Sequence, residues 1–308
     1  MRKVRPIHLR KDLSVTELVN QMHESGVLGA GRIAEAAELT AKMFRDPDYT
    51  VFLTLAGALV PGGLRSIIAD LINEQHINAL VTTGANMVHD MVEALGYNHY
   101  VGTFQAEDAE LRREKIGRIG DIYIEQAAFQ ALEKWLTKTL NEIPEKEKQR
   151  MAPSTILYEI GKRMEEKDSI LANASKKNVP IICPGLTDSI AGFQLWMISQ
   201  DQKLIMDPLL DVAKLVNMVY DAKKTGIIIL GGGWPKHFAL FANTFRQGVD
   251  TAVQITMDRP EPGGLSGASL DEAISWSKVK AKGGAVTVVC DATIAFPLIV
   301  AAALDRLD

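Results

Sequence analysis

The residues with the most obvious chemistry lie between positions 262 and 280. Glu272 and Trp276 are four positions apart, so on a helix they share one face, where a carboxylate beside an indole would bind an amine cation. Ser269 and Glu272 also have the spacing of a capping box, and Trp276 could equally be an ordinary core residue. Lys278 lies two positions past Trp276, so on an ideal helix it points to another face. A shared site therefore requires the helix to end or loosen just before Lys278. Otherwise Lys278 is a solvated lysine.

A second group of candidates follows three consecutive glycines. Pro235 indicates the start of a helix, which puts Lys236 and His237 in its first turn, where the helix dipole disfavours positive charge. A neutral His237 could therefore act as a general base near physiological pH. An ordinary surface histidine is the alternative interpretation.

Small residues occupy the turns in which five predicted strands pass into helices. These turns are Ala56-Gly57-Ala58, Thr82-Thr83-Gly84, Pro184-Gly185-Leu186-Thr187-Asp188, Gly231-Gly232-Gly233 and Asp291-Ala292. In open parallel sheets ligands bind at such strand ends, and free N–H groups at helix starts favour phosphate, so a dinucleotide is the natural candidate. Glycines that merely close tight turns are the alternative, because no complete G-x-G-x-x-G motif follows the first strand.

The elements that must position these residues follow from hydrophobic patterning. Short β-branched runs alternate with longer amphipathic segments, which is typical of a doubly wound, Rossmann-like α/β fold with a mostly parallel sheet and helices on both faces. The predicted strands are 50–57, 78–84, 179–185, 225–233, 251–256 and 285–290. The predicted helices are 64–74, 86–95, 208–222, 235–246, 270–277 and 292–307.

Two more helices are expected before the first strand, and Ser14 and Glu17 have the spacing of a capping box for the first of them. We expect one domain over residues 1–308, with a mostly helical region around 108–177.

Composition limits the possible functions. The chain has 308 residues, 47% of them hydrophobic, so it can bury a core without disulfides or structural metal. Cys183 and Cys290 each close an apolar run and are typical of buried strand residues in a reducing compartment. The basic amino terminus lacks the apolar stretch of a signal peptide, and no run is long enough to span a membrane. A formal net charge of -4 argues against nucleic acid, and we expect a cytoplasmic protein without a metal site.

Taken together, the motifs resemble the deoxyhypusine synthase family, and its archaeal branch in particular. The resemblance covers roughly residues 10 to 307 and includes the stretch AGRIAEAAEL near the start. It rests on an ordered set of segments: Val81-Thr82-Thr83, Leu186-Thr187-Asp188, Gly231-Gly232-Gly233, Lys236-His237, Ser266-Gly267-Ala268, Asp271-Glu272-Ala273, Ser275-Trp276, Lys278, Asp291-Ala292 and Phe296-Pro297.

The resemblance implies a homotetramer with NAD and active sites at subunit interfaces. The family's reaction transfers the aminobutyl group of the polyamine spermidine to one lysine of the precursor of translation initiation factor 5A. NAD takes a hydride from the carbon beside the secondary amine, and an enzyme lysine captures the resulting imine while diaminopropane leaves. The acceptor lysine then displaces the enzyme's lysine, and the retained NADH reduces the final imine.

Residue roles also follow from the resemblance. Lys278 matches the nucleophilic lysine and His237 matches the histidine that removes a proton during spermidine oxidation. Glu272 and Trp276 match polyamine-binding residues, and Ser266 lies in the same pocket. The residues that fall on cofactor-binding stretches are Thr82, Thr83, Gly84, Asp188, Gly231, Gly232, Gly263, Asp291 and Ala292.

Some positions depart from the eukaryotic pattern of the family. Phe193, Phe241 and Leu265 replace polar residues that contact the polyamine, so fewer groups specify a tri-cation. On the nucleotide side, Ala58 and Pro61 replace polar residues. His89 is a further departure, because it stands where a cofactor-binding glutamate is expected.

Two other functions therefore remain open. The first is the same chemistry with a small amine acceptor such as putrescine, as in homospermidine synthases. The second is nucleotide binding without catalysis, which the presence of Lys278, Glu272 and Trp276 disfavours.

Overall fold

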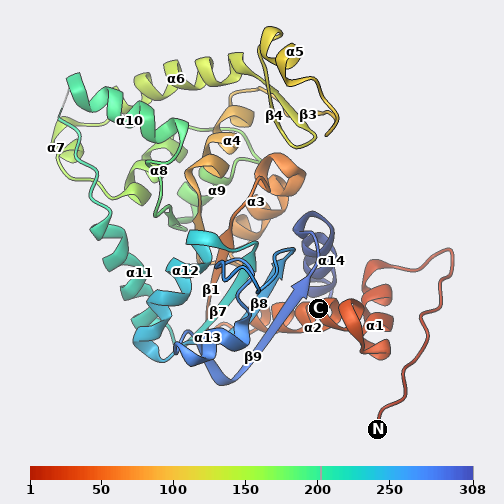
Figure 1. Ribbon diagram of the computed structural model, residues 1–308. Helices are drawn as coiled ribbons and strands as arrows, with labels where there is room; N and C mark the ends of the chain where they lie inside the picture. The colour runs from red at the N-terminus through yellow and green to blue at the C-terminus, as the bar shows by residue number, and fades with distance from the viewer. Residues whose placement is uncertain (202, 308) are drawn as a thin grey trace. The chain divides into compact units, whose positions relative to one another are not determined.

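The structure is a computed structural model that describes residues 1–201 and 203–307, and its largest sheet has six strands in the order β6-β2-β1-β7-β8-β9 (Figure 1). The strands are β1 (Tyr49–Leu55), β2 (Ala79–Thr82), β6 (Ile181–Ile182), β7 (Lys224–Leu230), β8 (Val249–Thr256) and β9 (Val279–Val289). Each overlaps one of the six predicted strands. The pairs β1 with β7, β7 with β8 and β8 with β9 are parallel, so the predicted doubly wound α/β class is confirmed.

The central strands owe their position to sequences that are apolar on both faces. In β7 the run from Thr225 to Leu230 is buried throughout, as expected for a parallel strand with helices on either side. In β8 the run from Thr251 to Thr256 is equally buried, although it contains Gln254. A buried glutamine in such a strand requires hydrogen-bond partners, and these lie in the candidate site described below.

By its internal contacts the described chain divides into two compact units. The first consists of Met1–Ala56, His76–Val81 and Val212–Asp308, and the second consists of Gly57–Gln75 and Thr82–Asp211. Among residues 1–201 and 203–307, no helix combines the length and apolar character needed to cross a bilayer.

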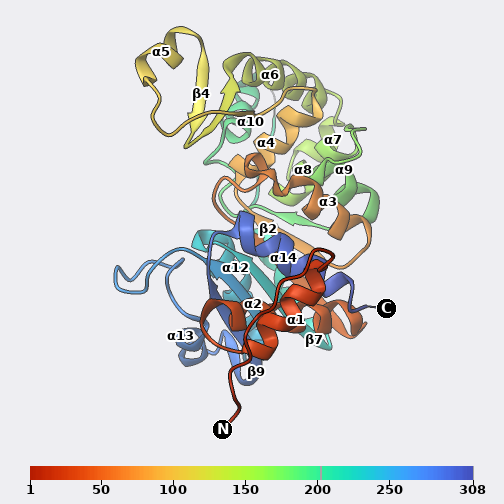
Figure 2. The same cartoon turned by 90° about the vertical axis from the view of Figure 1, so that its right-hand side faces the viewer.

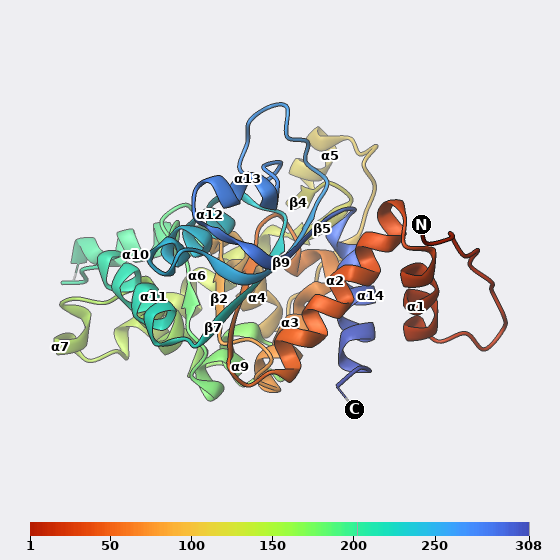
Figure 3. The same ribbon diagram turned by 90° about the horizontal axis from the view of Figure 1, so that it is seen from below.

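In the first unit, helices cover both faces of the sheet. Helices α2 (Leu28–Arg45) and α14 (Ala292–Leu304) pack together against β8, whereas α12 (Gly233–Ala242) contacts β1 and α13 (Leu270–Ser275) contacts β9. Figure 3 shows α12 and α13 on the side of the sheet opposite α2 and α14. The unit also contains α1 (Val15–Ser25), α11 (Leu209–Asp221) and the 3-10 helix η2 (Asn243–Arg246).

The helix starts of this unit follow local signals in the sequence. Ser14 caps α1 by accepting from the backbone N–H of Glu17, whose side chain accepts in return from the N–H of Ser14, so the predicted capping box is present. Asp291 caps α14 by accepting from the backbone N–H of Thr293.

The second unit is mostly helical (Figure 2). Its longer helices are α3 (Arg65–Asn73), α4 (Gly84–Ala94), α6 (Gln126–Asn141), α8 (Pro153–Gly161), α9 (Ile170–Lys177) and α10 (Ile190–Asp201), and the shorter ones are the π-helix η1 (Val60–Leu64), α5 (Asp108–Arg113) and α7 (Glu145–Lys148). An antiparallel sheet of β3 (Tyr100–Val101), β5 (Ile122–Glu125) and β4 (Ile116–Ile119) also occurs here. This sheet was not predicted from the sequence, because its strands are two to four residues long, with β3 exposed and β4 and β5 mostly half-buried.

A fully buried carboxylate joins three helices of the second unit. Asp90 on α4 accepts hydrogen bonds from Nε of Arg65 on α3 at 2.7 Å and from Oγ of Ser169 at 3.0 Å. It also accepts from the backbone N–H groups of Ile170 and Leu171, both at 2.9 Å, at the start of α9. Four donors around one carboxylate satisfy the buried charge and fix α3, α4 and α9 to one another.

Candidate functional site

The end of α13 determines where Lys278 points. The helix ends at Ser275, and Ser277 has a left-handed backbone with φ of 54°. The N–H of Ser277 donates to the carbonyl of Ile274 and the N–H of Lys278 donates to the carbonyl of Ala273, both at 3.0 Å. These two bonds form a Schellman motif, which reverses the chain and turns Lys278 back beside the helix. The condition for a shared site, a helix that ends just before Lys278, is therefore met.

Trp276 lies beside this lysine. The Nζ atom of Lys278 is 5.5 Å from the centre of the Trp276 ring, within the range of a cation–π contact. The Trp276 side chain is 66% exposed, so the alternative of an ordinary core residue is wrong. Lys278 itself is half-buried rather than fully solvated.

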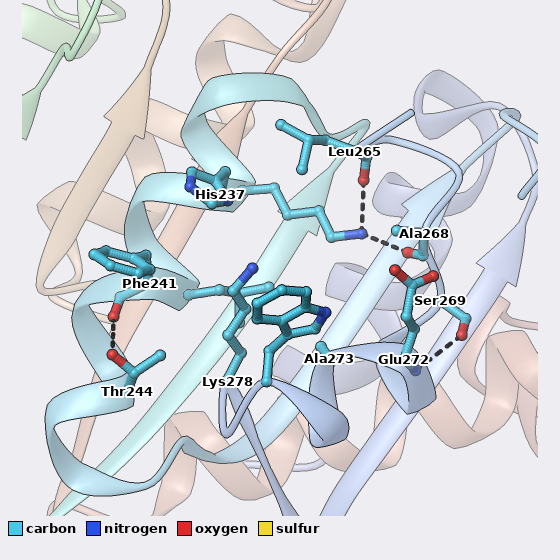
Figure 4. A pocket seen from close by; sticks show the side chains of 12 residues that line it. His237, Phe241, Thr244, Leu265, Ala268, Ser269, Glu272, Ala273 and Lys278 are labelled. Atoms are coloured by element: carbon cyan, nitrogen blue, oxygen red, sulfur yellow. Dashed lines mark hydrogen bonds between the residues drawn. The ribbon is translucent and has the colours of Figure 1, made fainter. Parts of the chain in front are cut away.

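The start of α13 leaves the carboxylate of Glu272 available. Ser269 caps the helix by accepting from the backbone N–H of Glu272 at 3.2 Å, but the reciprocal bond of a full capping box is absent from the described residues. The cap therefore uses the backbone of Glu272 and not its carboxylate. Figure 4 shows this carboxylate directed towards the loop that contains Leu265 and Ala268.

Helix α12 contributes His237 to the same site. The His237 ring stacks on Phe241 one turn later, with the ring centres 5.7 Å apart. Burial and the nearby charge of Lys278 lower the pKa of His237, so its neutral form is favoured. The helix dipole at the start of α12 predicts the same direction, but the causes here are burial and the charge of Lys278. Among the described residues the Nδ1 atom of His237 is buried and has no hydrogen-bond partner.

These side chains line one pocket of about 340 Å³ between α12 and α13 (Figure 4). Its lining residues are Lys236, His237, Leu240, Phe241, Thr244, Leu265, Ala268, Ser269, Glu272, Ala273, Trp276 and Lys278. The structure thus brings together His237, Glu272, Trp276 and Lys278, which were predicted from separate segments. The same lining has a single carboxylate and two lysines, so a ligand with several positive charges would find little counter-charge within one chain.

The two lysines of the pocket differ sharply in their surroundings. Lys236 is buried, and its Nζ atom donates to the carbonyls of Leu265 at 2.9 Å and Ala268 at 2.5 Å and to Oε1 of Gln254 at 3.2 Å. Burial lowers its pKa to about 8. The side-chain amine of Lys278 has no hydrogen bond or ion pair to any described residue, so it is available to a ligand.

Ser266 lies next to the pocket rather than in its lining. Its Oγ accepts from the backbone N–H of Gly233 at 3.1 Å, at the start of α12. Gly232 has to be a glycine here, because a Cβ atom would lie 2.3 Å from the Cα of Ser266. These contacts give Gly232 and Ser266 a role in packing the 258–269 loop on the turn after β7.

Among the other predicted cofactor residues of the first unit, Gly263 and Asp291 lie at open positions, whereas a Cβ on Gly231 would lie 3.1 Å from the carbonyl oxygen of Ala56. Gly231 and Gly263 both have positive φ, 76° and 72°, and no atom lies within 4 Å of the position of a Cβ on Gly263. Asp291 is exposed, and its carboxylate accepts from the N–H of Thr293 at 2.7 Å, whereas Ala292 is buried. Such turns allow a ligand to approach the backbone closely.

The remaining predicted cofactor residues belong to the second unit. Thr82 is buried at the end of β2, and Thr83 caps α4 by accepting from the N–H of Asn86 at 3.4 Å. A Cβ on Gly84 would lie 2.6 Å from the Cβ of Ser189, so Gly84 is needed for packing. Asp188 is exposed.

Asn86 organises these turns and was not predicted as a functional residue from the sequence. Its Nδ2 donates to the carbonyl of Gly57 at 3.0 Å and to Oγ1 of Thr83 at 3.1 Å, and its Oδ1 accepts from the N–H of Val60 at 3.2 Å. The signal in the sequence was an amide side chain in the first turn of a helix that was otherwise expected to be apolar on its inner face.

His89, the departure on the nucleotide side, belongs to a buried chain of hydrogen bonds. Its Nδ1 is 2.9 Å from Nε2 of His99, whose Nδ1 is 2.6 Å from Oε1 of Glu93. Burial, and secondarily the charge of His99, lower the pKa of His89 to about 4. His89 is therefore neutral in the folded protein at physiological pH.

We expect the stability of the protein to decrease as the pH falls from about 6.5 to about 4. Below 6.5 the unfolded chain binds a proton at His89 that the folded chain does not accept until about pH 4, so this residue costs up to about 3 kcal/mol at the acid end. Urea unfolding at a series of pH values measures the effect. His89→Gln should reduce the loss of unfolding free energy between pH 6.5 and pH 4. His8→Gln, at an exposed position, should not. Identical pH profiles for wild type and His89→Gln would contradict this account.

Fold and pocket together define a class: a doubly wound α/β protein with glycine-rich strand ends and a pocket that holds a free lysine, a histidine, an indole and a carboxylate.

Comparisons with known proteins give the family. A family model described as deoxyhypusine synthase matches residues 17–303, so the chain belongs to the deoxyhypusine synthase family. It is 44% identical over 304 residues to a "Probable deoxyhypusine synthase" of Methanothermobacter thermautotrophicus, covering 99% of this chain and 98% of the relative. It is 45% identical to "Probable deoxyhypusine synthase 1" of Methanosarcina acetivorans, over 96% of this chain and 92% of that one. The resemblance seen in the sequence is thereby confirmed.

A solved structure agrees on the fold. A crystal structure from Entamoeba histolytica that carries the name deoxyhypusine synthase matches with a TM-score of 0.69, over 96% of this chain and 95% of that chain. At 19% sequence identity this likeness concerns the fold alone.

Proposed function

We propose that this protein transfers the aminobutyl group of spermidine to a lysine of the precursor of translation initiation factor 5A, with NAD as cofactor. One observation carries the proposal. Lys278, the residue that matches the family's nucleophile, is free in a pocket that also contains His237, Glu272 and Trp276. A free amine in a confined pocket is what an exchange between imines requires.

The proposed steps use the residues of the pocket as follows. Glu272 and the ring of Trp276 bind an ammonium group of the donor. His237, whose pKa is lowered by burial and by Lys278, accepts the proton that the donor's secondary amine loses. Nζ of Lys278 then attacks the imine carbon, the bond from that carbon to the nitrogen of diaminopropane breaks, and that nitrogen takes up a proton as it leaves. The acceptor lysine attacks the new imine in the same way and releases Lys278.

The residues present also fit NAD. In the first unit, the turn after β7 and the 258–269 loop each have a glycine with positive φ, namely Gly231 and Gly263, and no atom lies within 4 Å of a Cβ placed on Gly263. Helix α12 begins directly after the first of these turns, where its N–H groups favour a pyrophosphate. When bound, NAD would supply the hydride acceptor for the donor and the hydride donor for the product.

The aromatic surface around the pocket supports a homotetramer in which a second subunit completes the site. Trp234, Phe241 and Phe245 on or beside α12 are 60%, 53% and 54% exposed. Exposed apolar groups at this density are typical of contact surfaces, and closure by a neighbour would exclude the water that hydrolyses imines. Light scattering tests the assembly, and an active monomer would refute it.

A single assay tests the proposed function. Purified protein is incubated with NAD and with spermidine labelled in its aminobutyl group, with and without the factor 5A precursor or putrescine. We expect label on the precursor protein, only when NAD is present. Because Phe241 and Leu265 make the pocket lining more apolar than the family pattern, the small-acceptor reaction is the second candidate, and label in free homospermidine would favour it. Absence of label in both products, together with no NAD binding by calorimetry, would refute the proposal.

We expect Glu272→Gln to weaken polyamine binding about tenfold without changing NAD binding or thermal stability. The reason is that the helix cap uses only the backbone N–H of residue 272, so the carboxylate is not part of it. Trp276→Ala should have a similar effect through loss of the aromatic face. Calorimetric titration and thermal melts measure both, with Asp271→Asn as the control, since it is an exposed carboxylate on the same helix outside the pocket lining. A lower melting temperature with unchanged polyamine affinity would show a structural role instead.

A further inference from the structure

A buried polar pair, Lys236 and Gln254, lies behind the pocket, and the proposed reaction steps do not use it. Gln254 is fully buried in the middle of β8. Its Nε2 donates to the carbonyl of Ser266 at 2.9 Å and, more weakly, to that of Gly231 at 3.5 Å, while its Oε1 accepts from Nζ of Lys236. A single amide thus contacts the turn after β7, the 258–269 loop and a buried lysine.

Lys236 completes the attachment of this loop. All three N–H bonds of its ammonium group have acceptors, and two of these are the carbonyls of Leu265 and Ala268 (Figure 4). At Gly267 a Cβ would lie 1.9 Å from the carbonyl oxygen of Arg259, so the loop also folds closely on itself at this point. Residues 265–268 are therefore fixed to the sheet, although Leu265, like residues 259–264, is exposed.

The hydrogen bonds of Lys236 and Gln254 matter to the pocket because residues 265–268 form part of its wall. Leu265 and Ala268 line the pocket directly, and Ser269 begins α13, which holds Glu272 in place. These hydrogen bonds of Lys236 and Gln254 form the anchor of the loop. Its loss would release both the apolar wall of the pocket and the start of α13, which carries the carboxylate of Glu272.

We propose that Lys236 and Gln254 act as one positioning unit, which fixes the 258–269 loop so that Leu265 and Glu272 face the amine substrate. This inference rests on the proposed function for its substrate, but the anchoring itself does not depend on it. Lys236 does not act as a second nucleophile, because its amine donates three hydrogen bonds and turns no lone pair towards the pocket.

Hydrogen exchange in the absence of any substrate tests the anchoring. Lys236→Met keeps the length of the side chain but removes the donors, and Gln254→Leu keeps the approximate volume of the amide. Each variant should speed amide exchange in residues 258–270 by about tenfold or more, because local opening of the loop costs less free energy without these hydrogen bonds. The double variant should show about the same increase as each single variant, because the pair acts as one unit. Lys282→Met, at an exposed lysine, should leave exchange unchanged.

Steady-state kinetics of the Lys236→Met and Gln254→Leu variants test whether the anchored loop contributes to substrate binding. Both variants should raise KM for the polyamine by about tenfold or more, with a smaller change in kcat, and borohydride should still trap the four-carbon fragment on Lys278. Unchanged exchange in residues 258–270 would overturn the inference, even if activity is lost. Trapping on Lys236 in the wild type would overturn it as well, because it would make Lys236 the nucleophile. If the wild type transfers no amine but the variants still release the loop, the proposed function fails and the anchoring stands.

Discussion

Replacing Lys278 with methionine should abolish aminobutyl transfer, with a loss of about 1,000-fold or more in rate. The pocket has one lysine whose amine is free, since the amine of Lys236 is held by three acceptors. Without Lys278 no group in the pocket can form the covalent imine, and a water-mediated route would release the four-carbon fragment as an aldehyde. The measurement is transfer of labelled aminobutyl group to the acceptor, combined with borohydride trapping and mass spectrometry of the adduct.

Two controls separate this chemistry from a loss of structure. Lys278→Met should bind NAD as the wild type does and should melt within a degree or two of it, because the side-chain amine makes no hydrogen bond to a described residue and the hydrogen bonds of the backbone are retained. Lys282→Met, four residues along the chain, should retain full activity. Substantial residual transfer by Lys278→Met would mean that the covalent route is wrong.

Asp90→Ala should destabilise the protein by about 3–5 kcal/mol, the largest effect on stability that we expect from a single substitution. The carboxylate is fully buried and accepts from Arg65, Ser169 and the backbone at the start of α9. Its removal leaves a buried guanidinium with less counter-charge and three further donors without acceptors. Denaturant unfolding, followed by circular dichroism, measures the change.

The matched control is Asp70→Ala, which removes an exposed carboxylate from α3 and should change stability by less than about 0.5 kcal/mol. Ser169→Ala should have an intermediate effect, because it removes one of the four donors to Asp90 and also the cap of α9. Equal stability of Asp90→Ala and Asp70→Ala would show that the four hydrogen bonds do not join the helices as described.

Much of the fold could be predicted because its signals are local. The apolar runs that became β1, β7 and β8 are buried on both faces, and such runs form parallel strands wherever helices cover them. The small sheet of β3, β4 and β5 could not be predicted, because strands this short carry no clear alternation. At Ser269 the spacing predicted a full capping box, but only the bond from the backbone of Glu272 formed.

By itself, the sequence determined the doubly wound class, the family and the set of residues from which the pocket is built. Only the tertiary structure decided how those residues are used. Lys278 reaches Trp276 because Ser277 adopts a left-handed backbone, a conformation that serine rarely takes and that helical periodicity does not predict.

Which of the two lysines has a free amine is likewise determined only by the tertiary structure. Lys236 and Lys278 are the same residue type, and both stand in motifs of the family. They differ because the acceptors of Lys236 come from β8 and from a loop some 30 residues away in the sequence, which brings three oxygens around one ammonium group. Periodicity and spacing describe neighbours along the chain. Which amine is held and which is free depends on contacts between distant segments, and only the folded chain makes these.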